Sequence, residues 1–270
     1  MLLRYLILSV FLFVFITADM KAYSQQKIKD FYLSNFKDDG TQDWEVKGKE
    51  ATIHDKHVDI DDMEANYYAE DDTILITSDE ARLNKENMDI YLKDNVHIEN
   101  EEGATLDTDS LNWKREDNHI DTDDRVKTIR DSMQIEALGL SADTQLKKAA
   151  FKKDVEVTLP DKKSKEITTA TCSGPLEIEY NEGKAIFNQN VVVINPQAKL
   201  YSDKATLFFD TKNKEIVKII SEGNVKIVRG NDVTFSQKAT YLSKEQKVIL
   251  EGRPRVIYYP NSDDEPNIFK

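Results

Sequence analysis

The chain has 270 residues, and its 37 Lys and Arg against 50 Asp and Glu give a formal net charge of −13. Such an acidic chain excludes sequence-independent nucleic-acid binding, which needs a basic footprint, and 32% charged residues exclude a polytopic membrane protein. One Cys and four His leave no room for a disulfide framework or a Cys-rich zinc site.

The first segment, Met1–Ala18, is apolar at fifteen of eighteen positions, and Arg4 is its one charge. A membrane-spanning helix needs about 17–25 residues, and the run is just long enough if Arg4 snorkels to the headgroups. Its charged start, apolar middle and small terminal residue also fit a cleaved signal peptide. We expect residues 1–22 to form an apolar helix that anchors a periplasmic body in the inner membrane. The alternative is a cleaved signal and a soluble periplasmic protein.

The next stretch, Lys27–Phe36, admits a short helix, but beyond it the apolar residues alternate with polar ones, as in strands. A recurring unit consists of an apolar strand, a polar bend and Val-x-apolar. It recurs at intervals of 30, 29, 36, 34 and 31 residues, centred on Val96, Val126, Val155, Val191, Val225 and Val256. This periodicity predicts a β-repeat of about thirty residues with two strands in each repeat.

A second strand lies between these units and has the form small/polar-Asp-x-Ala-x-Leu, as in Ser78–Leu83 and Ser202–Leu207. In the first kind of strand the apolar positions keep the same parity on both sides of the bend, as in Leu92 and Val96. One bent, continuous strand therefore explains each unit without a hairpin. We predict an all-β, long antiparallel fold with one apolar face and free strand edges at its ends.

The repeat behind a single apolar segment resembles the periplasmic lipopolysaccharide-transport proteins of the OstA/LptA–LptC superfamily. The stretches that carry the resemblance to LptC are DWEVKGKEATI (43–53), NYYAEDDTILITSDEARL (66–83), DIYLKDNVHIENEEGATLDTDSLNW (89–113) and GLSADTQLKKAAFKKDVEV (139–157). The stretches AKLYSDKATLFFD (198–210) and SEGNVKIVRGNDVTFSQKATYL (221–242) resemble the OstA/LptA repeat. An LptC-like chain would end near residue 165, and here the repeats continue. We therefore divide the body into an LptC-like jellyroll, 23–165, and an OstA/LptA-like continuation, 166–270.

The resemblance implies a non-catalytic β-jellyroll with a V-shaped slot that carries the acyl chains of lipid A from an inner-membrane transporter toward the outer membrane. It implies three kinds of partner: lipopolysaccharide, the ABC-transporter complex, and other jellyroll bridge proteins joined by edge-strand pairing. An acyl chain needs a continuous apolar lining, which the alternating positions supply. The candidate lining residues are Ile76, Met88, Ile90, Leu92, Val96, Ile98, Phe151, Val155, Phe187, Val191, Leu207, Phe209, Ile219, Val225, Ile227 and Leu250.

The last strand, at Val256, Ile257, Tyr258 and Tyr259, is the candidate docking edge, because Pro254 precedes it and Pro260 ends it. We expect no catalytic site, no cofactor and no metal, since His97 and His119 lie on the polar parity among solvated Asp residues. Asp107, Asp109 and Asp121 form no convincing pair of glycosidase carboxylates. The alternative function is an exported β-solenoid scaffold or a glycan-acting enzyme.

Overall fold

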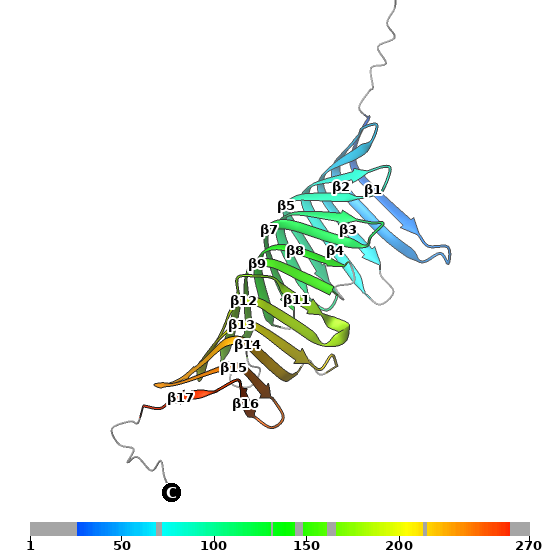
Figure 1. Cartoon of the computed structure of the whole chain (residues 1–270). Coiled ribbons are helices and arrows are strands. Elements are labelled where there is room, and N and C mark those ends of the chain that lie inside the picture. The colour runs from blue at the N-terminus through cyan, green and yellow to red at the C-terminus, as the bar shows by residue number, and fades with distance from the viewer. Residues whose placement is uncertain are drawn as a thin grey trace, which may run out of the picture.

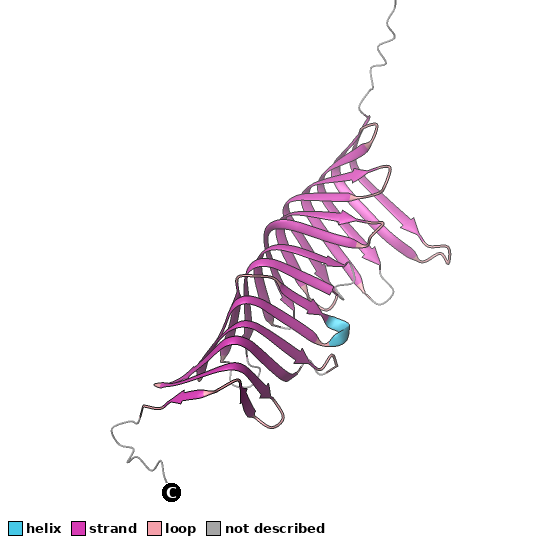
Figure 2. Ribbon diagram, viewed as in Figure 1, coloured by secondary structure: helices cyan, strands magenta, loops and turns pink. Residues whose placement is uncertain are grey.

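A computed structural model describes residues 26–68, 72–130, 132–143, 148–160, 166–212 and 215–259. Within these ranges the chain forms a single 17-stranded sheet and one short 3-10 turn, η1. Figure 2 shows how completely strands dominate the molecule. The elements are β1 (Gln26–Phe36), β2 (Gln42–Ile53), β3 (His57–Tyr68), β4 (Thr73–Asn84), β5 (Ile90–Asn100), β6 (Thr105–Lys114), β7 (His119–Arg130), β8 (Met133–Asp143), β9 (Lys148–Pro160), β10 (Ile167–Cys172), β11 (Leu176–Glu179), η1 (Tyr180–Glu182), β12 (Lys184–Asn195), β13 (Ala198–Phe209), β14 (Ile216–Arg229), β15 (Asp232–Leu242), β16 (Lys247–Glu251) and β17 (Arg255–Ile257).

Each long strand pairs antiparallel with the next one in the sequence, so the sheet is a meander that runs from β1 to β17 (Figure 1). Two positions in the meander are filled by pairs of short strands. β10 and β11 together lie between β9 and β12, and β16 and β17 both pair with β15. The sheet is therefore continuous along the whole described chain, including the predicted boundary between residues 165 and 166.

Every long strand bends near its middle, and the aligned bends fold the sheet into two walls. In β5 the bend is at Asp94 and Asn95, and in β12 it is at Gln189 and Asn190, all with positive φ. Asn and Asp tolerate this left-handed conformation better than other non-Gly residues do. The pairing register shifts at these points, between Lys93 and Val96 for example, as in a β-bulge. We call the half containing Leu92 and Leu111 the first wall, and the half containing Val96 and Val126 the second wall.

The aligned bends form a crease along which the two walls meet. On the outside of this crease, polar side chains link neighbouring bends. The Asn95 side-chain amide donates to Asp79 at 2.7 Å, and the Asn224 amide donates to Asp203 at 2.9 Å in the second half of the chain. At Gly223, whose φ is +74°, an added Cβ would lie 2.3 Å from the Asp203 carboxylate, so only Gly fits beside that contact. The Asp of the small/polar-Asp-x-Ala-x-Leu motif therefore serves the bend of the adjacent strand.

The core lies between the two walls and forms a row of buried cross-strand partners, interrupted between Leu111 and Thr122, where the register of β6 and β7 shifts. Along the first wall the register joins Ala81 to Leu92, Leu92 to Leu111, and Leu140 to Phe151. The row continues through Leu176, Phe187, Ala205, Ser221, Ala239 and Leu250. Cross-strand pairs of this kind are the units that stabilise a sheet, so the row links the stability of both halves.

The predictions of an all-β antiparallel fold and of strands that run through their bends are confirmed. The expected N-terminal helix and Met1–Ala18 lie outside the described residues. The helix expected at Lys27–Phe36 is wrong, because this stretch is β1, paired with β2. The apolar residues Ile28 and Phe31 are three positions apart, as on one face of a helix. They share a face of the strand because β1 bends at Asp30, where φ is +49°.

Candidate functional site

The space between the two walls is the candidate site, and its deepest positions are fully packed. At the crease, Leu92, Val96, Val126, Leu176 and Val225 each expose at most 1% of their surface. Burying a side chain of this size stabilises the fold by about 1.5–3 kcal/mol. The crease is therefore a closed core in this structure, and side chains nearer the rims of the walls are the more accessible ones.

Most predicted lining residues point into this space. Ile76, Leu92, Val96, Phe151, Val155, Phe187, Val191 and Val225 are buried in it, while Ile90, Ile98, Leu207, Phe209, Ile219, Ile227 and Leu250 are partly buried along it. Met88 departs from the pattern, because it lies in the turn before β5 with φ +61° and is 38% exposed. The alternation that begins at Ile90 does not extend back to it. Contact of any of these residues with lipid stays a prediction.

Within the described residues, two ring contacts join the rims of the two walls, and we call them the mouth contacts. Tyr67 on the second wall meets Trp113 on the first, with ring centroids 6.2 Å apart in an edge-to-face arrangement. Arg130 on the second wall lies over the ring of Tyr180 on the first, with its guanidinium carbon 4.6 Å from the centroid. Such contacts stabilise by about 0.5–2 kcal/mol each. They bridge the opening between the walls near the middle of the chain.

Polar atoms without partners also face this interior. Among the described residues, the buried side-chain atoms that lack a hydrogen-bond partner are Trp113 Nε1, Arg130 Nε, Ser202 Oγ and Ser236 Oγ. Ser202 pairs with Val191 and Ser236 pairs with Val225, so both hydroxyls share the inward face. An unpaired buried polar group costs about 1–3 kcal/mol. Water or the polar atoms of a ligand in the interior would satisfy these groups.

The interior changes character along its length. Leu92, Leu111, Leu140, Phe151 and Leu176 fill the first-wall row in the first part of the chain. Beyond Phe187 the same row is occupied by the small residues Ala205, Ser221 and Ala239. The row in the first half also holds the small residues Ala81 and Thr122, so the difference between the halves lies in the number of Leu and Phe side chains.

The junction of the two predicted halves is as well packed as the rest of the interior. Leu176 pairs with Phe151 on one side and with Phe187 on the other, which carries the row across the junction. Cys172 is buried at the crease beside it, and its thiol donates to the Gly174 carbonyl at 3.3 Å. Burial raises the pKa of this thiol, so Cys172 is a packing residue here.

Both ends of the described sheet have an unpaired strand edge. β1 pairs only with β2 among the described residues, and β17 pairs only with β15. Val256 and Tyr259 are 65% and 55% exposed at the C-terminal end. At the other end, hydrogen bonds from Tyr32 and Asn66 lower the pKa of Glu45 to about 2. The bond from Tyr32 to Glu45 links the side chains of β1 and β2. Val256 and Ile257 of the expected edge strand lie in β17, whereas Tyr258 and Tyr259 follow its end, and docking at this edge stays a prediction.

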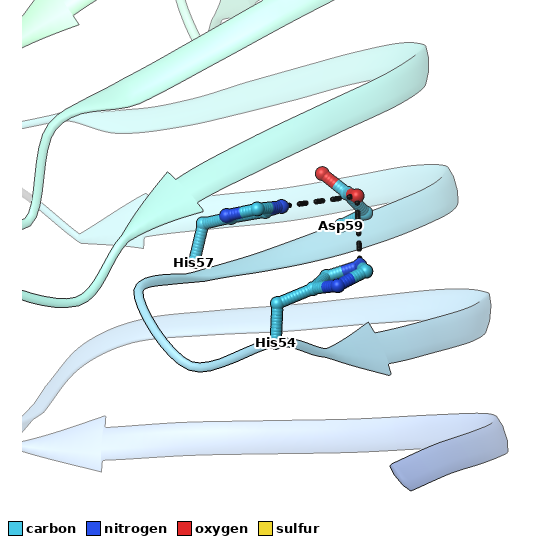
Figure 3. A group of neighbouring side chains, drawn as sticks. All are labelled: His54, His57 and Asp59. Carbon is cyan, nitrogen blue, oxygen red and sulfur yellow. Dashed lines mark ion pairs between the residues drawn. The ribbon is translucent and has the colours of Figure 1, made fainter. Parts of the chain in front are cut away.

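The His residues considered in the sequence have ordinary partners. His97 Nδ1 lies 2.6 Å from Asp107 Oδ1, and His119 Nε2 lies 3.2 Å from the Ser141 hydroxyl. Sequence reasoning overlooked a different group, His54, His57 and Asp59, whose side chains converge on the outside of the β2–β3 hairpin (Figure 3). Its signal was the spacing His-x-x-His-x-Asp across a two-residue turn.

Comparison with known families gives two matches. Residues 63–160 match the family described as lipopolysaccharide-assembly, LptC-related, and residues 172–267 match the family described as LptA/(LptD N-terminal domain) LPS transport protein. No curated protein matches the chain significantly.

The two matches confirm the expected order of an LptC-like segment followed by an OstA/LptA-like segment, and they support a role in lipopolysaccharide transport. Both descriptions name assembly or transport, and neither names a reaction. In the described part of the chain, no helix has the length and apolar character needed to cross a membrane.

Proposed function

We propose that this chain, which joins an LptC-related segment to an LptA-like segment in one polypeptide, carries the acyl chains of lipopolysaccharide between its two walls across the periplasm. The observation that supports this most directly is the inner row from Ala81 to Leu250, which is apolar except at Thr122 and Ser221 and has one register shift, between β6 and β7. It crosses the junction at Leu176 without a charged or exposed residue. An acyl chain that moves from one half to the other needs such a continuous apolar path.

Acyl chains enter by separation of the walls at their rims. The crease is packed in this structure, so a chain the width of a fatty acid displaces rim side chains and opens the mouth contacts. The second half, where Phe209, Ile219 and Ile227 are only partly buried, takes the lipid more easily than the Leu-rich first half. The phosphorylated headgroup stays outside, because the chain has a net charge of −13 and repels anions.

Photocrosslinking from two adjacent Phe positions tests the function. Phe209 lies on the inner face of β13, whereas Phe208 lies on the outer face, with Lys218 Nζ 4.3 Å from its ring centroid. We expect a benzophenone amino acid at position 209 to capture lipopolysaccharide in living cells at least several-fold more often than one at position 208. The readout is an adduct that reacts with antibody to lipopolysaccharide on a gel.

The pair is well matched, because both positions hold Phe in the same strand and differ only in the face they present. Ile227 and Lys226 on β14 form a second pair with the same geometry. Equal capture at inner and outer positions of both pairs would refute transport between the walls.

We propose in addition that the free edges join this protein to its neighbours. The edge of β1 faces the transporter complex in the inner membrane, and the edge of β17 pairs with the next jellyroll of the bridge. Residues 1–22 anchor the chain, residues 23–165 form the LptC-like part, and residues 166–270 extend the bridge. A single polypeptide then covers part of the span that separate proteins would otherwise assemble.

Two proline substitutions distinguish docking from folding at β17. Val256 and Ile257 pair with Thr234 and Val233 of β15, and backbone N–H groups alternate in direction along a strand. One of Val256→Pro and Ile257→Pro therefore removes a hydrogen bond to β15, and the other removes a donor from the free edge. We expect the variant that loses only the free-edge donor to lose at least tenfold in capture of a purified jellyroll bridge protein while its melting temperature is retained. Wild-type capture by both variants would place the docking surface elsewhere.

A further inference from the structure

The hairpin between β2 and β3 gathers three ligand-type side chains on one outer face. The His54 backbone N–H donates to the His57 carbonyl at 2.9 Å and closes a two-residue turn, so the two His residues lie side by side. Asp59 follows His57 by two residues and shares its face, while Val58 and Ile60 between and beyond them point inward. The imidazole rings stack with centroids 4.3 Å apart (Figure 3).

The backbone of the turn that carries His54 and His57 is held by a neighbouring loop, so the turn keeps its shape before any ion binds. Lys85 Nζ donates to the His54 carbonyl at 2.6 Å, and the Lys85 backbone N–H donates to the Lys56 carbonyl at 2.9 Å. A preorganised set of donors binds more tightly, because less conformational entropy is lost on binding.

The distances among the three side chains suit a small metal ion. Asp59 Oδ2 lies 3.1 Å from His54 Nε2 and 3.4 Å from His57 Nε2, and the three ligand atoms all lie within 4.8 Å of one another. Ligand atoms at the corners of a tetrahedron around zinc, with bonds of about 2.0–2.1 Å, are about 3.3 Å apart. Both Nε2 atoms already point at one carboxylate oxygen, as the dashed lines in Figure 3 show.

Arg82 donates hydrogen bonds to the Asp59 carboxylate. Its Nε donates to Asp59 Oδ1 at 2.7 Å, and its second contact, from Nη2 to Oδ2, is longer at 3.3 Å. The stronger bond therefore falls on the oxygen that faces away from the imidazoles and orients Asp59, as hydrogen-bond partners of metal ligands commonly do. The charge of Arg82 opposes a cation, so we expect a site of modest affinity.

We propose that His54, His57 and Asp59 form a binding site for a divalent transition-metal ion such as zinc, with a fourth coordination position open to solvent. Two imidazoles and a carboxylate favour zinc, copper or nickel over calcium and magnesium, which prefer all-oxygen sites. His57 and Arg82 also line a surface hollow of about 310 Å³, so the site can be reached from outside. A bound ion would hold the β2–β3 hairpin in place beside β1.

The test is isothermal titration of the purified full-length chain, without a polyhistidine tag, with zinc chloride. We expect one site per chain, and a dissociation constant at least tenfold weaker in each of His54→Ala, His57→Ala and Asp59→Asn. His97→Ala is the matched control, because His97 also pairs with a carboxylate but has no second imidazole in the group. It should bind zinc with wild-type affinity.

Two further measurements keep the result independent of folding. His54→Gln retains a side-chain amide that can donate to Asp59 but is a poor metal ligand, and it should fold normally while losing zinc. Cobalt chloride should give visible absorption bands of a four-coordinate N/O site with the wild type alone. Zinc binding by the His54→Ala/His57→Ala double variant that equals wild-type binding, or a wild type that binds no zinc, would overturn the proposal.

Discussion

A covalent link across the mouth contacts is expected to abolish lipid loading. Cysteines in place of Tyr67 and Trp113, joined by a short bis-maleimide, would tie the rims of the two walls together where their rings now meet 6.2 Å apart. If acyl chains enter by separation of the walls, the linked protein should lose nearly all photocrosslinking to lipopolysaccharide from position 209. The unlinked double variant should keep it. The measurement compares adduct yield before and after linkage.

The design has an internal control on a single wall. Tyr180 and Phe209 also form an edge-to-face pair, 5.7 Å apart, but both lie on the first wall. Linking cysteines at these positions leaves the rims free to separate, so loading should continue when it is read from position 227. Cys172 is buried and stays unmodified under native conditions. Full loading in the Tyr67–Trp113 linked protein would show that lipid does not pass between these rims.

A cavity at the junction is expected to weaken the whole described sheet in one transition. Leu176 is 1% exposed and lies between Phe151 and Phe187. A Leu→Ala change at such a position costs about 2–5 kcal/mol in the free energy of unfolding. For a chain of this size that corresponds to roughly a 5–15 °C fall in the melting temperature. Because the described strands form one continuous sheet, we expect Leu176→Ala to shift a single cooperative transition.

Glu177→Ala is the control, since Glu177 lies on the same strand but is exposed, and its change should stay within about 0.5 kcal/mol. The measurement is thermal unfolding followed by far-ultraviolet circular dichroism and by calorimetry. Two separate transitions, of which Leu176→Ala moves only one, would mean that residues 23–165 and 166–270 unfold independently despite the shared sheet.

The parts of this fold that depend on local pattern were predictable from sequence. Alternation of apolar and polar residues is a property of each strand by itself, so the strands and the thirty-residue repeat could be found without a structure. The same is true of the step of four residues from Leu92 to Val96 and from Phe187 to Val191, which keeps one face inward through a bend. The free edge at Val256 followed from the prolines around it.

Only the tertiary structure showed how the strands with the small/polar-Asp-x-Ala-x-Leu motif, such as β4 and β13, cross the crease. There the inward face steps by three residues, from Ser78 to Ala81 and from Ser202 to Ala205, which breaks simple alternation. In the small/polar-Asp-x-Ala-x-Leu motif, the first residue and the Ala are the two inward positions on either side of this step. Ser78 Oγ donates to the Glu80 carbonyl at 3.0 Å, so the hydroxyl stabilises the bend itself. The reason appears only when the adjacent bends are aligned.

The contacts between elements distant in sequence were also decided by the tertiary structure. Tyr67 meets Trp113, and Arg130 meets Tyr180, because the bends bring the two walls face to face, and the angle of a bend is not encoded in the period of its strand. His54, His57 and Asp59 converge only because the hairpin has a two-residue turn and places all three on one face. The sequence by itself therefore determined the repeat and its apolar face, and the packing of one wall against the other decided where that face is closed.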